Sequence, residues 1–127
     1  MKTVATTDHY VIEVDEKKNR ILFTMKGSWT STKAVPNWLE DVKKALQLVR
    51  PGFTELVDWT AVGAIALTDY IAAAQDLAMQ AGMRKAARVY ASERFLKIQM
   101  DNLTEKTKFP VQSFFSHEDA NAWLDKR

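Results

Sequence analysis

The side chains that could carry out chemistry are few in this sequence and do not combine into a catalytic pattern. The two histidines, His9 and His117, have no carboxylate or nucleophile at a fixed local spacing. They are also far apart, whereas paired metal-binding histidines on a helix lie about four residues apart. The chain has no cysteine, which excludes a thiolate nucleophile, a zinc–thiolate site and a disulfide framework. We therefore expect no metal and no cofactor.

Glycine motifs and carboxylate pairs give no catalytic signal either. The four glycines are scattered and match neither a dinucleotide-binding loop nor a nucleoside-triphosphate-binding loop. The glycine–serine–glycine elbow of hydrolases is not present. The adjacent acids Glu40 and Asp41 lie on a predicted helix, where neighbours in sequence do not face each other. The sequence therefore predicts that the protein is not an enzyme.

The most informative stretch runs from residue 57 to residue 69 and joins a predicted strand to a predicted helix. Ligand sites in open α/β sheets form at the carboxyl ends of parallel strands, and free backbone N–H groups at a helix start favour an anion. In the simpler interpretation, which we favour, Thr68 caps the helix while Asp58 and Thr60 stabilise a turn. We weigh packing and partner contact equally for Trp59. The candidate partner-binding residues are Asp58, Trp59, Thr60, Leu67, Thr68, Asp69 and Arg94.

Hydrophobic periodicity predicts the elements that position this stretch. Alternation of apolar residues predicts an opening hairpin, and apolar stripes at helical spacing predict amphipathic helices. The predicted strands cover 10–14, 21–25, 53–58, 86–91 and 111–115, and the stretch 59–67 is predicted as a loop. The predicted helices cover 35–49, 68–81, 92–103 and 116–124, with caps at Ser31 or Thr32, at Thr68, at Ser92 and at Ser116.

Strands that alternate with helices indicate an α/β fold. We predict a mixed four- or five-stranded sheet, in which an antiparallel hairpin is followed by parallel strands, flanked by about four helices. Residues 1–127 are predicted to form a single domain with a core over about 10–124. Trp38 and Trp123 lie on apolar helical stripes, so both are expected to be largely buried.

The strand-end stretch 57–62 and the ending 113–124 carry a resemblance to a known family. In the ending, an aromatic strand precedes a helix that carries Ala120, Trp123 and Leu124. With the order of elements, these stretches resemble the SpoIIAA-like proteins, relatives of the STAS domain of bacterial anti-sigma-factor antagonists. The resemblance spans about 10–124. It implies a mixed sheet flanked by helices and no enzymatic activity.

The resemblance also implies how such a protein would act. Antagonists of this type bind a kinase or an anti-sigma factor through the loop before the second helix. A serine there, in an Asp-Ser-Ser-Gly-like motif, is phosphorylated to switch binding off. Here Leu67 takes the place of the phospho-acceptor and Asp69 that of the glycine, with Thr68 as a neighbouring hydroxyl. This departure argues against a phosphorylation switch and places the chain nearer the SpoIIAA-like branch.

Two functions remain open from the sequence. The first is a regulatory module that binds an unknown protein partner, of the anti-sigma or kinase type, through residues 58–69. The second is a small carrier or sensor of an apolar, lipid-like ligand, supported by adaptable apolar side chains: Leu67, Met79, Met83, Phe95 and Met100. Exposed aromatic residues near the hairpin would allow a homodimer.

The charge and the hydropathy of the chain restrict its partners and its compartment. A net charge of +2 with interspersed signs gives no reason to expect nucleic acid as a partner. No stretch reaches the roughly 18 apolar residues of a membrane span, and the first eight residues do not form a signal peptide. We therefore expect a cytoplasmic protein without membrane insertion.

Overall fold

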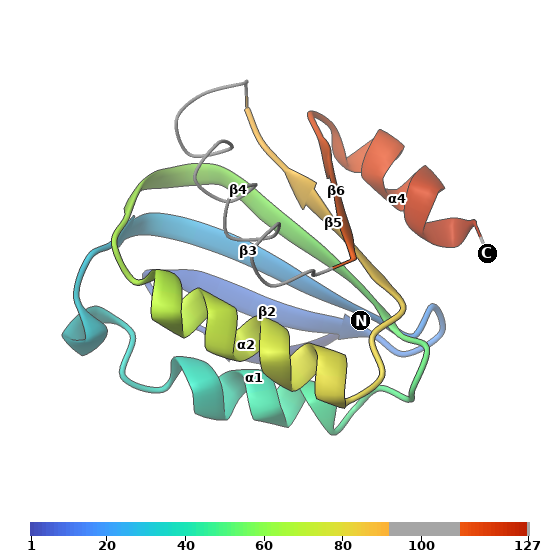
Figure 1. Ribbon diagram of the computed structural model, residues 1–127, viewed down its shortest axis with the longest axis horizontal. Helices are drawn as coiled ribbons and strands as arrows, with labels where there is room; N and C mark the ends of the chain where they lie inside the picture. Colours follow the sequence, from blue (N-terminus) through green and yellow to red (C-terminus); the bar gives the residue numbers. More distant parts are fainter. Residues whose placement is uncertain (92–109, 127) are drawn as a thin grey trace.

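Six strands of the described residues form one sheet in which strands that follow one another along the chain are also neighbours in space (Figure 1). The computed structural model describes residues 1–91 and 110–126. The strands are β1 (Lys2–Thr6), β2 (Tyr10–Asp15), β3 (Arg20–Trp29), β4 (Thr54–Ile65), β5 (Lys85–Val89) and β6 (Val111–Phe114). The helices of these residues are the short 3-10 helix η1 (Thr32–Ala34), α1 (Trp38–Leu46), α2 (Thr68–Gln80) and α4 (His117–Asp125).

The sheet is mixed, as the sequence predicts. The pairs β1–β2 and β2–β3 are antiparallel, whereas β3–β4, β4–β5 and β5–β6 are parallel. The predicted parallel pairing of 53–58 with 86–91 is confirmed, because Leu56 lies opposite Ala87 in the β4–β5 register. The predicted strand count is too low by at least one, since β1 adds an edge strand. The helix predicted over 92–103 lies outside the described residues.

Helices cover both faces of the sheet. The helices α1 and α2 lie on one face, and α4 packs on the other, against β4, β5 and β6 (Figure 1). Strand residues alternate between these faces. Glu55, Val57 and Trp59 of β4 therefore lie on the side of α1 and α2, and Leu56 lies on the side of α4.

Aromatic rings fill the core between the hairpin and α1. Trp38 is buried as predicted, and its ring lies edge-on to those of Tyr10, Phe23 and Trp29, with centroids 4.9–5.7 Å apart. The Tyr10 hydroxyl donates to Asp41 Oδ2 over 2.6 Å. The aromatic residues near the hairpin are therefore core residues. The premise of the homodimer prediction, that they are exposed, is wrong.

The segment predicted as a loop, 59–67, is strand as far as Ile65. It pairs with β3 from Lys26 opposite Ala61 to Trp29 opposite Ile65, across one register shift between Gly27 and Ser28. Gly27 lies between these pairs with a φ of 70°, a left-handed conformation that favours glycine. The strand predicted over 21–25 is also longer than expected, because β3 continues past Gly27 to Trp29. Small residues in 60–66 weakened the strand pattern in the sequence.

Two helix starts also differ from prediction. Ser31 caps η1, through a bond from the Lys33 N–H, and α1 begins only at Trp38, beyond Pro36. Thr68 is the first residue of α2 and not its cap. The cap position belongs to Leu67, which has no side chain able to accept a hydrogen bond.

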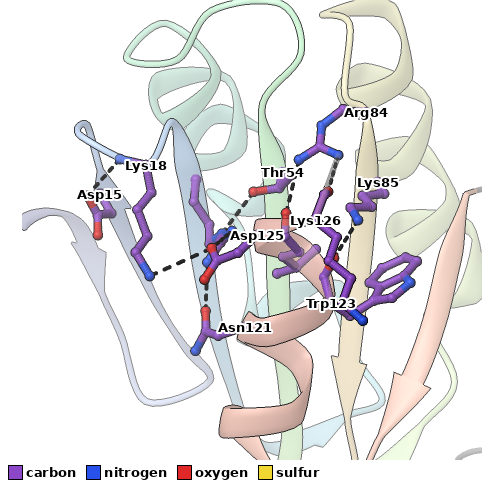
Figure 2. A network of polar contacts seen from close by, with 11 residues as sticks. Asp15, Lys18, Thr54, Arg84, Lys85, Asn121, Trp123, Asp125 and Lys126 are labelled. Atoms are coloured by element: carbon purple, nitrogen blue, oxygen red, sulfur yellow. Dashed lines mark hydrogen bonds and ion pairs between the residues drawn. The ribbon is translucent and has the colours of Figure 1, made fainter.

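The helix α4 is fixed at both ends by polar contacts. Ser116 caps its start and accepts the Asp119 N–H over 3.1 Å, as predicted. At its end, the buried Arg20 donates to Thr54, Asn121 and Asp125 over 2.8–2.9 Å (Figure 2). The hydrogen bond from Arg20 lowers the pKa of Asp125.

Two basic side chains next to this network supply donors to the last carbonyls of α4. Arg84 donates to the carbonyls of Leu124 and Lys126 over 2.8–3.0 Å, and Lys85 donates to the carbonyl of Trp123 (Figure 2). Lys85 also lies 4.4 Å from the centre of the Trp123 ring. Trp123 packs on Phe114 and is partly buried, so the expectation that it is largely buried holds less fully than for Trp38. This network lies at the amino ends of β3, β4 and β5, away from the candidate site.

Candidate functional site

The second half of β4 extends beyond the end of its neighbour in the sheet, β5. β5 ends at Val89, which lies opposite Asp58, and in the described chain residues 60–65 of β4 pair only with β3. Most of this extension is exposed, including Thr60, Ala61, Gly63 and Ala64. It leads into α2, where Asp69 is exposed and Leu67 and Thr68 are half-buried. We call these exposed residues, 60, 61, 63, 64 and 69, the β4–α2 surface.

Asp58 connects β4 to the start of α4. Its Oδ1 accepts from the backbone N–H and the hydroxyl of Thr60, over 2.8 and 2.7 Å. Its Oδ2 lies 2.7 Å from Nε2 of His117. Burial acts to raise the pKa of Asp58, but the bonds from Thr60 and His117 outweigh it, so this pKa is lower than usual. The prediction that Asp58 and Thr60 stabilise a turn is wrong, because the two residues bond to each other within strand β4.

His117 is the residue of this site that sequence reasoning missed. It is half exposed and is the first residue of α4, whereas Asp58 lies 59 positions earlier in β4. No local spacing links them, so the fold alone brings them together. The pair does not form a catalytic triad, because the Thr60 hydroxyl bonds to Asp58 and not to the imidazole. Among residues 1–91 and 110–126, no cluster of three or more metal-ligating side chains occurs.

The structure separates Trp59 from the rest of the candidate set. Its ring is buried on the face covered by α1 and α2, so packing is its role in the isolated chain. Its Nε1–H is buried and has no hydrogen-bond partner among the residues that the structure describes. The other candidates at 58, 60, 67, 68 and 69 line the extension of β4 and the start of α2. Arg94 lies outside the described residues.

A cavity of about 40 Å³ lies beside Trp59, between the sheet and α2. Its walls are mostly apolar but include Glu55 of β4, Gln75 of α2 and Arg88 of β5. All three polar residues are buried. Burial raises the pKa of Glu55 to about 8, although the charge of Arg88 acts to lower it. No pattern in the sequence indicates this cluster, because a charged residue in a strand usually faces water.

Similarity to known proteins is found in structure and not in sequence. Neither a protein-family model nor a curated protein sequence matches the chain. An uncharacterized protein of the DUF3478 family with a SpoIIAA-like fold, from Shewanella loihica PV-4, superposes with a TM-score of 0.68 at 15% identity. This match covers 94% of the present chain and 97% of the other. An anti-sigma factor antagonist from Mycobacterium paratuberculosis gives a TM-score of 0.60 at 16% identity, covering 96% and 99%.

These matches define the class of the molecule at the level of fold. The chain has a SpoIIAA-like α/β fold, and the fold implied by the sequence resemblance is confirmed. No helix in the described parts of the chain is long and apolar enough to cross a membrane.

Proposed function

We propose that this protein is a non-catalytic regulatory module that binds a partner protein through the β4–α2 surface. The observation that carries this proposal is the exposed half of β4, which extends past β5 and continues into α2. Exposed backbone and small side chains permit close approach of another chain. An anti-sigma factor antagonist that shares the fold supports a regulatory role.

Asp58 and His117 border this surface and give it polar contacts. Because Asp58 already accepts three close contacts, it holds Thr60 and the start of α4 in fixed positions. Trp59 supports the strand from inside and Leu67 lies at its junction with α2. Arg94 remains a predicted contact. The partner class is a protein of the anti-sigma or kinase type, and a cytoplasmic location would suit it.

The apolar-carrier hypothesis has less support. Of the residues that suggested it, Leu67, Met79 and Met83 do not line the cavity beside Trp59. Met79 is exposed, and Met83 packs in the core below α2. Phe95 and Met100 lie outside the described residues, and the hypothesis stays a prediction.

A quantitative pull-down from the native host tests the partner-binding proposal. Ala61→Arg and Ala64→Arg each place a large charge on the β4–α2 surface. Glu16→Arg adds a similar charge in the exposed β2–β3 turn, at the other end of the sheet, and serves as the matched control. We expect both surface variants to keep the wild-type melting temperature and to lose a partner that the control retains. Equal capture by all three variants would place the binding site elsewhere.

A further inference from the structure

The indole of Trp59 carries a buried hydrogen-bond donor that no described residue satisfies. Trp59 is 3% exposed, and its Nε1–H has no partner in the described parts of the chain. In folded proteins the large majority of buried polar side-chain atoms bond to a protein group or to an ordered water. An acceptor other than a described side chain or carbonyl is therefore expected at this N–H.

Two other tryptophans in the same core have protein acceptors. The Nε1–H of Trp29 donates to the carbonyl of His9, and that of Trp38 donates to the carbonyl of Tyr70, each over 3.2 Å. Trp59 instead lines the cavity of about 40 Å³ between the sheet and α2. The acceptor for its N–H can therefore come from a molecule in that cavity.

The volume of the cavity selects the kind of occupant. About 40 Å³ exceeds the roughly 10–15 Å³ that a cavity needs to hold a water molecule, and it is close to the roughly 30 Å³ that one water occupies in the liquid. It is far below the roughly 150 Å³ of an engineered cavity that binds benzene. Water fits this space, and an organic ligand does not.

The polar side chains of the cavity give a water further partners. Glu55 of β4, Gln75 of α2 and Arg88 of β5 line it together with Trp59, and all are buried. Gln75 and Arg88 already make other interactions. A carboxyl, amide or guanidinium group can bond to more than one partner, and a buried water typically makes about three hydrogen bonds. A purely apolar cavity stays dry, whereas polar groups from three elements line this one.

We propose that the cavity beside Trp59 is a binding site for an ordered water molecule, which accepts the Trp59 Nε1–H. The water takes this bond on an oxygen lone pair and directs its own protons to acceptors in the polar wall. It satisfies the donor at the point where β4 passes into its exposed extension, since Thr60 follows Trp59 directly. The site is independent of the β4–α2 surface and of any protein partner.

Water–protein Overhauser spectra of the ¹⁵N-labelled wild-type protein test this site. The indole N–H of Trp59 is assigned from its contacts to Ile71, which shares the cavity wall, and from its loss in Trp59→Phe. We expect a cross-peak from this N–H to water, with opposite signs in laboratory-frame and rotating-frame spectra. Opposite signs mark a water that stays bound, whereas direct proton exchange gives equal signs. Trp29 and Trp38, whose N–H groups have carbonyl acceptors, are internal controls and should show no such peak.

The carboxyl group of Glu55 can imitate a bound water, because an acidic proton exchanges with the solvent. Glu55→Gln removes this proton, and we expect the Trp59 cross-peak to remain. Wild-type protein well above pH 8, where Glu55 is mainly ionised, gives the same comparison without a variant. The absence of a cross-peak at Trp59, or its loss once residue 55 carries no acidic proton, would overturn the proposal.

Discussion

Replacement of Glu55 by glutamine should change how the stability of this protein depends on pH. The carboxyl group is buried beside Arg88, and its pKa rises from an ordinary 4.5 to about 8 on folding. The folded state therefore binds this proton more tightly than the unfolded chain does. The associated stability is fully present below pH 4.5 and is lost as pH rises through about 8.

The magnitude follows from the size of the pKa shift. One pKa unit corresponds to about 1.4 kcal/mol, and the difference between 4.5 and about 8 therefore gives an upper bound of about 5 kcal/mol. Glutamine resembles the protonated acid in shape and cannot ionise. We expect Glu55→Gln to match wild type near pH 4 and to exceed its free energy of unfolding by about 2–5 kcal/mol near pH 9.

Urea denaturation across this pH range measures the difference directly. Wild type and variant differ only at residue 55, so subtracting the two profiles isolates the contribution of that residue. Glu16→Gln, the same change at an exposed turn position, is the matched control and should give a profile parallel to wild type. Parallel profiles for wild type and Glu55→Gln would refute the reasoning, because they would show that Glu55 is ionised in the folded protein at neutral pH.

Four further predictions follow from other parts of the structure. Trp38→Ala should lower the free energy of unfolding by about 3–5 kcal/mol, and a loss below about 1 kcal/mol in a urea titration would contradict its place in the aromatic core. Ser116→Ala should cost about 0.5–2 kcal/mol by the same measurement, because it removes the cap of α4. Asp58→Asn should make the stability of the protein less sensitive to acid, because a lowered carboxyl pKa contributes stability that is lost as pH falls through the folded-state pKa. An unchanged loss of stability at low pH, measured by urea denaturation, would be inconsistent with this. Thr68→Ala should change stability by less than about 0.5 kcal/mol, and mass spectrometry after incubation with an antagonist kinase and ATP should find Thr68 unmodified.

The sequence predicted the elements in which apolar and polar residues alternate regularly or a capping motif is present. The alternation in 10–14 and 21–25 and the capping box at Ser116 correspond to β2, β3 and α4. β1 was missed because Lys2–Thr6 is short and half of it is polar. The extension of β4 was missed because residues 60–65 form a strand by pairing with β3. Local strand propensity does not reveal such pairing.

The candidate site was predicted only in part, for a similar reason. The predicted chain topology identified Asp58 as a candidate, because it ends a parallel strand. Its partner His117 lies in a helix 59 residues later, and no local pattern links the two. Glu55 lies in β4 and Arg88 in β5. A charged residue in a strand normally indicates that its side of the sheet faces solvent. Only the presence of α2 above them shows that this side is buried.

The strand order has a consequence for how the chain reaches its fold. Because β1 to β6 occur in the sheet in the order of the sequence, each strand adds to the edge formed by the one before it. No strand has to enter between two that are already paired. The sheet can therefore grow along the chain from one end to the other. Each new strand then requires closure of only the one connection that links it to the strand before it.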